Sequence, residues 1–221
     1  TTGRDRLERA DWRVYVILDP RANLEDRSLI EVARAVLAGG TGVLQLRDKQ
    51  SSGRELVETS LELTELCREH DALFIVNDRL DVALAAGADG VHLGPHDIAI
   101  DDARRVAPEL VIGGSAGTPD RAATLAEQGA DYLGVGAVYD ADPSKPDASA
   151  PRGPDALAAV VEGVQIPVVG IGGITAETAG EVAAAGADGV AVIRAVVGAD
   201  DPERAARELS NRFAGNGRET G

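Results

Sequence analysis

The sequence lacks the residues and patterns that mark several classes of protein. Among 221 residues there is a single cysteine, Cys67, which excludes an internal disulfide and fits a reducing compartment. It shows no basic-then-apolar leader and no apolar run long enough to cross a bilayer, so we expect a cytoplasmic location. Aromatic residues make up only 3% and the formal net charge is −15, which disfavours nucleic acid and anionic membranes as partners.

Lysine is scarce in this chain. Of the 22 basic residues only Lys49 and Lys145 are lysines, and all the others are arginines. Lysine is a compact point charge whereas arginine is a rigid planar fork, so the two are not interchangeable at a binding site. Both lysines follow expected strands, in QLRDK and DPSK, which makes them candidate binding residues. Chance retention on the surface is the alternative.

What the chain does contain is an alternation of apolar strands and amphipathic helices. The predicted strands are 14–18, 43–46, 74–76, 89–93, 110–112, 132–135, 168–171 and 189–193. AGGTGVLQL, AAGADGVHL, EQGADYLGV and AAGADGVAV each run from a helix end through glycine into a strand, a weak repeat at every second strand. This pattern predicts an α/β fold, a single-domain (β/α)8 TIM barrel, with a doubly wound open sheet as the alternative. We expect a frayed or helical lead-in at 1–11, the barrel over 12–214 and a disordered tail at 215–221.

Two aspartates follow the third and fourth strands. The stretch 75–97, IVNDRLDVALAAGADGVHLGPHD, reads as strand, helix and strand, and leaves Asp78 and Asp97 after its strands. In a parallel sheet both residues emerge at the same edge, where two carboxylates can hold a hard divalent cation. The alternative is that each aspartate caps the helix that follows it.

Active sites of such barrels lie at the carboxyl ends of the strands. The polar residues and glycines expected there are Gln45, Arg47, Lys49, Asn77, Asp78, Asp97, Ser115, Lys145, Gly172 and Gly173. Three cations and two acids on one rim suit a diphosphate that shares Mg²⁺ with the carboxylates.

The glycine pair after the seventh strand, in IPVVGIGGIT, predicts a second anion site. Glycines let a phosphate approach the backbone, and a helix capped by Thr175 would offer unpaired N–H groups to it. A tight turn without a ligand is the alternative.

Together the motifs resemble the thiamine-phosphate synthase family. QLRDK, IVNDR, ADGVHLG with a later aspartate, GxS after the fifth strand, ADYLGVG, and IPVVGIGGIT followed by GADGVAV match it in order and spacing over residues 12–197. The resemblance implies a transferase on the (β/α)8 barrel. Such an enzyme joins an aminopyrimidine (4-amino-2-methyl-5-hydroxymethylpyrimidine) diphosphate to a thiazole phosphate, 4-methyl-5-(2-phosphoethyl)thiazole, releasing diphosphate and forming thiamine monophosphate.

The resemblance also implies a role for each matching residue. The pyrimidine diphosphate would be bound by Gln45, Arg47, Lys49, Asn77, Ser115 and Lys145, the Mg²⁺ by Asp78 and Asp97, and the thiazole phosphate by Gly173, Ile193 and Arg194. Arg47, Lys49 and Lys145 would be catalytic because they stabilise the charge that develops on the departing diphosphate. The reaction needs no general base, so His92 is expected to point into the barrel and His96 to lie in a loop. Small-molecule substrates are the expected partners, and a homo-oligomer is left open.

Three places depart from the usual family pattern. Pro95 stands where glutamine is usual and Arg194 where serine is usual, and the loop before Lys145 is acidic, with Asp140 and Asp142 instead of threonines. Proline lacks both the glutamine side chain and a backbone N–H.

Three alternatives to a synthase share the barrel. A thiazole tautomerase would carry a histidine shortly after the strand-five serine, where this chain has Gly117. A regulatory barrel that only binds thiamine phosphate would have no need of the Asp78 and Asp97 pair. Another phosphate-sugar enzyme would use the Gly172-Gly173 site but not QLRDK.

Overall fold

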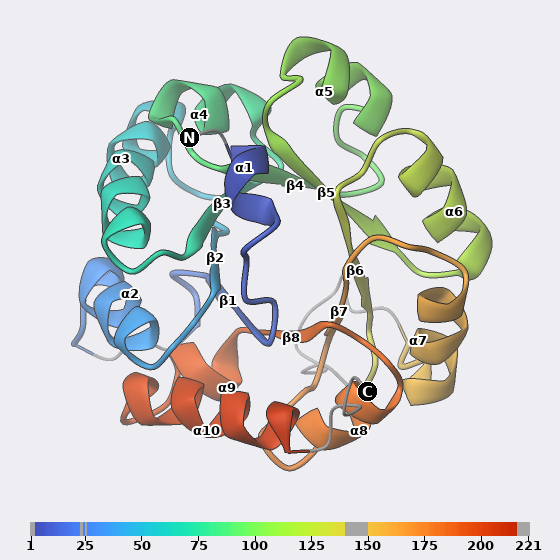
Figure 1. The fold of residues 1–221 in the computed structure, drawn as a ribbon. Coiled ribbons are helices and arrows are strands. Elements are labelled where there is room, and N and C mark those ends of the chain that lie inside the picture. Colours follow the sequence, from blue (N-terminus) through green and yellow to red (C-terminus); the bar gives the residue numbers. More distant parts are fainter. Residues whose placement is uncertain (1–2, 23, 25, 140–149, 216–221) are drawn as a thin grey trace.

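The computed structural model describes residues 3–22, 24, 26–139 and 150–215. Its eight parallel strands pair in chain order and close into a barrel with the helices around it (Figure 1). The strands are β1 (Val14–Leu18), β2 (Val43–Leu46), β3 (Leu73–Asn77), β4 (Gly90–Leu93), β5 (Val111–Ala116), β6 (Tyr132–Gly136), β7 (Val168–Ile171) and β8 (Gly189–Val192). The helices are α1 (Gly3–Leu7), α2 (Leu29–Ala38), α3 (Gly53–Glu69), α4 (Leu80–Ala86), α5 (Ile100–Val106), α6 (Pro119–Glu127), α7 (Gly153–Glu162), α8 (Ala179–Ala184), α9 (Arg194–Val197) and α10 (Pro202–Ala214). The predicted (β/α)8 barrel is confirmed.

Strand alternation divides the buried residues into two cores. Successive side chains of a strand point to opposite faces, so Val14, Val16 and Leu18 of β1 pack under the helices while Tyr15 and Ile17 point into the barrel. The buried side chains of the interior core are those of Trp12, Tyr15, Ile17, Val43, Leu73, Ile75, Val111, Tyr132, Val169 and Ala191. This filled interior makes the barrel a packed core rather than a channel.

The ends of several helices follow from local sequence. Ser28 and Ser52 form capping boxes with Glu31 and Glu55, which start α2 and α3. Gly87 ends α4 in the left-handed conformation, with a φ of 60°. None of the helices in the described ranges has the length and apolarity that a membrane crossing would require.

The fifth strand and the segment after the seventh strand are two places where the structure differs from the sequence prediction. β5 continues through Gly113 and Gly114 to Ala116, because Gly113 pairs with both β4 and β6 and this pairing outweighs the low strand propensity of glycine. The predicted start of a helix at Thr175 is wrong. The Thr175 N–H donates to Thr178 Oγ1 within a turn, and α8 begins at Ala179.

The repeated aspartate of the GAD segments bonds adjacent strands together at the amino ends of the barrel. A carboxylate oxygen of Asp89 accepts the Phe74 N–H of β3 at 2.8 Å. Asp131 accepts the N–H of Ile112 in β5, and Asp188 that of Val168 in β7, both also at 2.8 Å. Each loop therefore holds the start of the preceding strand, which gives the sequence repeat a structural reason.

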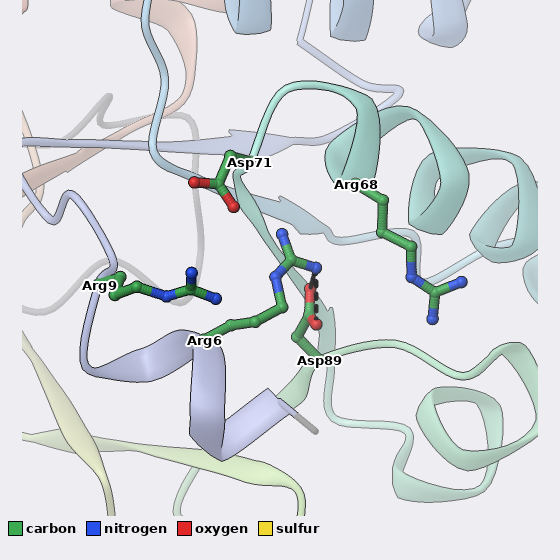
Figure 2. A pocket seen from close by; sticks show the side chains of 5 residues that line it. All are labelled: Arg6, Arg9, Arg68, Asp71 and Asp89. Atoms are coloured by element: carbon green, nitrogen blue, oxygen red, sulfur yellow. Dashed lines mark hydrogen bonds and ion pairs between the residues drawn. The ribbon is translucent and has the colours of Figure 1, made fainter. Parts of the chain in front are cut away.

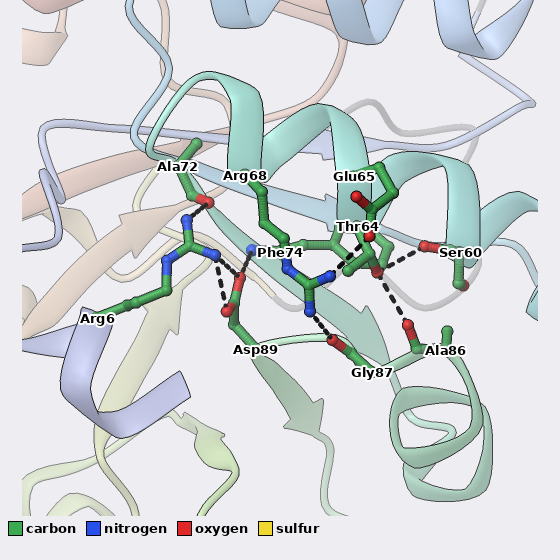
Figure 3. A network of polar contacts seen from close by, with 10 residues as sticks. All are labelled: Arg6, Ser60, Thr64, Glu65, Arg68, Ala72, Phe74, Ala86, Gly87 and Asp89. Carbon is green, nitrogen blue, oxygen red and sulfur yellow. Dashed lines mark hydrogen bonds and ion pairs between the residues drawn. The ribbon is translucent and has the colours of Figure 1, made fainter. Parts of the chain in front are cut away.

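The lead-in folds over this same end of the barrel, where α1 contacts β3 and β5 (Figure 1). Arg6 Nη1 lies 2.9 and 3.0 Å from the two carboxylate oxygens of Asp89, and its Nη2 donates to the Ala72 carbonyl at 2.5 Å (Figure 3). Arg4 Nη2 donates to Asp131 at 3.0 Å. The segment 1–11 is thus tied, in its described part, to the aspartates that hold the strands.

A polar hollow of about 420 Å³ opens beside α1 (Figure 2). It is lined by Arg6, Arg9, Arg68, Asp71 and Asp89. Arg68 donates to Glu65 at 2.7 Å and to the Gly87 carbonyl at 3.1 Å, so its guanidinium is held by the surrounding helices (Figure 3). The hollow lies at the amino ends of the strands, where barrels place stabilising contacts rather than chemistry.

Candidate active site

The opposite end of the barrel gathers most of the polar residues predicted for the site. Gln45 of β2 points into the barrel and is only 3% exposed. Asn77 ends β3 in register with His92 of β4, and Ser115 lies near the end of β5. Four neighbouring strands, β2 to β5, therefore bring amide, imidazole and hydroxyl groups to one rim.

Arg47 is held in place by an aspartate that the sequence prediction missed. Arg47 Nη1 lies 2.6 Å from Asp19 Oδ2, and Arg21 binds the same carboxylate through Nε and Nη2 at 3.0 and 2.8 Å. Burial acts to raise the pKa of Asp19, but the hydrogen bonds from Arg21 and the charges of both arginines outweigh it and lower the pKa to about 2. Asp19-Pro20 directly follows β1, so the rule that selected Asp78 and Asp97 could also have selected Asp19.

Asp78 and Asp97 lie together at the rim beside Lys49. Lys49 Nζ is 3.5 Å from Asp78 Oδ2, and Asp97 Oδ2 accepts the Gly94 N–H at 2.7 Å. Burial, the Asp97 charge and a hydrogen bond with Asp97 raise the pKa of Asp78, and Lys49 offsets only part of this shift. Two carboxylates in mutual contact could hold a divalent cation between them.

The helix-capping interpretation of these aspartates is wrong. α4 is capped by Arg79 and α5 by Ala99, and neither cap makes a side-chain hydrogen bond. Asp78 instead has a φ of 63°, a conformation in which its N–H donates to the His92 carbonyl at 2.8 Å. Non-glycine residues with such a φ are uncommon and concentrate at functional sites.

The described residues contain no cluster of three or more histidine, cysteine or acidic side chains suited to a metal. A cation held by Asp78 and Asp97 would need further ligands, which water or phosphate oxygens could supply. Mg²⁺ is bound in this way, through one or two carboxylates and substrate phosphates.

His92 points into the barrel, as predicted. Its Nδ1 is 3.1 Å from the Tyr132 hydroxyl and its Nε2 is 3.0 Å from Ser115 Oγ. Burial lowers the pKa of His92 to about 4, and the Asp97 charge opposes only part of that shift. The imidazole is therefore neutral at pH 7. His96 is exposed in the loop after β4.

The glycine pair after β7 adopts conformations that favour glycine, with φ of 102° at Gly172 and 63° at Gly173. A Cβ at Gly172 would lie 2.7 Å from the Ala137 Cβ, so no larger residue fits there. Ile193 and Arg194 begin α9, a short helix directly after β8. Lys145, like the acidic residues before it, lies outside the described residues.

Sequence and structure comparisons give a consistent result. A family model described as thiamine monophosphate synthase matches residues 14–196. The thiamine-phosphate synthase of Moorella thermoacetica is 49% identical over 199 residues, which cover 90% of this chain and 94% of that protein. That of Natronomonas pharaonis is 44% identical over 207 residues, covering 93% and 96%.

Solved structures agree. Thiamine phosphate pyrophosphorylase from Pyrococcus furiosus superposes with a TM-score of 0.86 at 42% identity, covering 95% of this chain and 98% of that one. A 3-hexulose-6-phosphate synthase, at 22% identity and a TM-score of 0.65 over 91% and 99% of the two chains, shares the fold alone. The barrel, its rim and these relatives together show that the chain is a transferase that belongs to the thiamine monophosphate synthase family.

Proposed function

We propose that this rim joins an aminopyrimidine diphosphate to a thiazole phosphate, releasing diphosphate and forming thiamine monophosphate. The observation that carries the proposal is the contact of Asp78 with both Asp97 and Lys49, with Arg47 after the same strand as Lys49. Cations next to a carboxylate pair match a ligand that carries several negative charges and a divalent cation.

Arg47, Lys49 and Lys145 bind the diphosphate in this proposal. Because Asp19 already fixes Arg47, little side-chain entropy is lost when the ligand arrives. Lys49 keeps half of its side chain exposed and is free to turn from Asp78 toward a phosphate. Lys145 is included on the strength of the sequence motif.

The carboxylates of Asp78 and Asp97 fit Mg²⁺, because burial and repulsion from Asp97 raise the pKa of Asp78 and a bound cation would favour its charged form. Mg²⁺ bound there would supply positive charge to the leaving diphosphate. Gln45, Asn77 and Ser115 orient the pyrimidine ring.

The reaction proceeds by ionisation. The bond between the exocyclic methylene carbon and the diphosphate oxygen breaks and its electron pair leaves with diphosphate. The thiazole nitrogen then donates its lone pair to the pyrimidine cation and forms the new C–N bond. No proton has to be removed, which agrees with a neutral His92 that is hydrogen-bonded on both sides. Arg47 and Lys49 stabilise the charge that develops on the leaving group.

Gly173, Ile193 and Arg194 bind the thiazole phosphate in this proposal. They follow β7 and β8, the strands whose loops commonly form the phosphate site of a (β/α)8 barrel.

The tautomerase alternative has no support at position 117, where a Cβ on Gly117 would lie 3.2 Å from Arg152 Nη2. The single cysteine fits a reducing compartment such as the cytoplasm, and the net charge of −15 disfavours nucleic acid and anionic membranes as partners.

Diphosphate release tests this function. The pyrimidine diphosphate is supplied with and without the thiazole phosphate, in Mg²⁺ and then in excess EDTA. We expect release only when both substrates and Mg²⁺ are present, with thiamine monophosphate as the product. Binding of the thiazole phosphate without any release would instead favour a tautomerase or a regulatory barrel.

A further inference from the structure

A line of hydrogen bonds crosses the barrel interior from Gln45 to Ser115. Gln45 Nε2 donates to the Tyr15 hydroxyl at 2.7 Å, and the Tyr15 and Tyr132 hydroxyl oxygens are 2.8 Å apart. The Tyr132 hydroxyl is 3.1 Å from His92 Nδ1, and His92 Nε2 is 3.0 Å from Ser115 Oγ. Both end residues are proposed above to bind the pyrimidine, whereas the three between them have no role in that mechanism.

The barrel leaves space for the rings that form this line. A Cβ at Gly113 of β5 would overlap the Tyr132 ring, and one at Gly134 of β6 would lie 3.2 Å from His92 Cε1. Trp12 packs on Tyr132 with ring centroids 4.8 Å apart. Tyr15 is 1% exposed and Tyr132 is fully buried, so water does not replace these hydrogen bonds.

The protons in this line can be assigned because each hydroxyl has one proton to donate. Tyr15 accepts from Gln45, and the only other polar atom that its hydroxyl contacts among the described residues is the Tyr132 oxygen, to which it must donate. Tyr132 therefore donates to His92 Nδ1. Because Nδ1 accepts from Tyr132, the imidazole carries its proton on Nε2 and donates it to Ser115 Oγ.

The opposite direction of these hydrogen bonds would leave a buried hydroxyl donor without an acceptor. With Gln45 Nε2 directed at Tyr15, donation from Tyr132 to Tyr15 would leave the Tyr15 hydroxyl without an acceptor in the described part of the chain, and a buried unsatisfied donor costs free energy. Burial raises the pKa of both tyrosines, so each keeps its proton at neutral pH.

We propose that Tyr15, Tyr132 and His92 are positioning residues that fix Gln45 as an acceptor and Ser115 as a donor toward the pyrimidine. The Gln45 Nε2 is used by Tyr15, so its Oε1 faces the ligand, and the Ser115 hydroxyl proton is free because Oγ accepts from His92. This polarity matches a 4-aminopyrimidine, which offers an amino donor and an unprotonated ring nitrogen. A 4-oxopyrimidine offers the reverse pair, a carbonyl acceptor and a ring N–H. The proposal rests on the proposed function, since it assumes that the ring binds at this rim.

The test compares dissociation constants, which need no turnover. Calorimetry in Mg²⁺ measures the 4-amino and 4-oxo pyrimidine diphosphates, together with inorganic diphosphate as a probe without a ring. We expect the wild-type protein to prefer the 4-amino ligand by at least about 100-fold, since a site built to pair with donors and acceptors rejects a mismatched ligand strongly.

The decisive variant is Tyr15→Phe. It removes the hydroxyl that accepts from Gln45 Nε2, so the Gln45 amide can rotate and present either its oxygen or its nitrogen to the ligand. We expect its preference for the 4-amino ligand to fall by at least about tenfold, while its affinity for inorganic diphosphate stays unchanged. Thr64→Val is the matched control. It also removes a buried hydroxyl, one that donates to the Ser60 carbonyl at 2.7 Å on α3, but it leaves the line of hydrogen bonds intact (Figure 3). Its ligand preference should equal that of the wild type.

Different failures point to different errors. Wild-type protein that binds the 4-amino ligand no better than inorganic diphosphate would contradict the proposed function. Wild-type protein that prefers the 4-amino ligand, with Tyr15→Phe keeping the full preference, would overturn the positioning role alone. If Tyr15→Phe does not fold, Tyr132→Phe breaks the same line one step further on, and an unchanged preference there would equally overturn the proposal.

Discussion

At the scale of single residues, the carboxyl groups of Asp19 and Asp78 differ in the direction in which their pKa is shifted. Two arginines hold the pKa of Asp19 far below its usual value, whereas burial and a second carboxylate raise that of Asp78. The first aspartate is therefore a fixed anion that orients Arg47. The second is an acid whose negative charge Lys49 only partly compensates, which agrees with the proposal that Asp78 binds a cation.

Replacing Asp78 by asparagine should lower Mg²⁺-dependent diphosphate release by about 100-fold or more, because the cation loses a charged ligand. Asparagine tolerates the positive φ of this position, so the unfolding free energy should stay within about 1 kcal/mol of wild type. Asp81→Asn is the control, since Asp81 is an exposed aspartate three residues away that pairs with Arg79. Normal turnover of Asp78→Asn would show that Asp78 is not a ligand of the metal.

Asp19 should make stability depend on pH in the acid range. Its pKa is about 2 in the folded protein and close to 3.8 when unfolded, so the unfolded chain binds more protons between these values. The stabilisation is complete above about pH 4 and is lost as the pH falls through 2. In Asp19→Asn, urea unfolding measured between pH 4 and pH 2 should show a shallower fall of the unfolding free energy. An unchanged slope would contradict the lowered pKa.

The residues at the rim could be predicted from sequence because each one lies near the carboxyl end of a strand or in the loop that follows it. Gln45, Asn77, Asp78, Asp97 and Ser115 all lie where strand periodicity placed them. The contact of Tyr15 with Tyr132 could not be predicted in this way, since 117 residues separate the two. Only barrel closure brings their hydroxyls together, and no local pattern encodes a partner at that distance.

At the scale of elements, β5 shows why a strand can contain adjacent glycines. Gly113 faces the barrel interior under the Tyr132 ring, whereas Gly114 faces the helices, where a Cβ would lie 3.1 Å from Leu125 Cδ1. Gly113→Ala should lower the unfolding free energy by about 3 kcal/mol through overpacking. Gly114→Ala should change it by less than about 1 kcal/mol, because a leucine methyl can shift. Equal effects in chemical denaturation would contradict the assignment of these faces.

The short α1 should contribute to stability and not to turnover. Arg6 and Asp89 have side chains only 10% and 7% exposed, so Arg6→Gln leaves a buried carboxylate without its cation. We expect a loss of about 3 kcal/mol in unfolding free energy with unchanged diphosphate release. Arg9→Gln removes the same charge from an exposed neighbour and should change stability by less than about 0.5 kcal/mol. If Arg6→Gln lowers turnover while Arg9→Gln does not, the prediction is wrong, and the end of the barrel that carries α1 influences the rim at the opposite end.

The start of a helix is marked in the sequence where its cap is local, and it is unmarked where no side chain caps it. The starts of α2 and α3 follow from serine capping boxes within four residues. By contrast, α9 is a single turn with no side-chain cap at Ile193, so its sequence carries no start signal. The turn after Gly173 replaced a predicted helix start because Thr175 bonds to Thr178 instead of capping.

At the scale of the whole molecule, the net charge of −15 produces self-repulsion. Raising NaCl from low concentration to about 0.5 M should screen it and raise Tm by about 2–4 °C, the shift that about 1 kcal/mol gives in a domain of this size. Sucrose at matched osmolality controls for general solute effects. A lower Tm in salt would mean that ion pairs such as Arg4–Asp131, which salt also screens, stabilise the fold by more than the repulsion destabilises it.

The aspartates of the repeat have a consequence for how this barrel can evolve. Asp89, Asp131 and Asp188 fasten the strands at the end of the molecule away from the rim that carries the proposed chemistry. Mutations in the loops of that rim can therefore change which substrate is bound or which reaction is catalysed without weakening these three hydrogen bonds between the strands. A lineage that keeps these three carboxylates keeps the contacts between its strands, while the loops of the opposite face can change under selection for new activities.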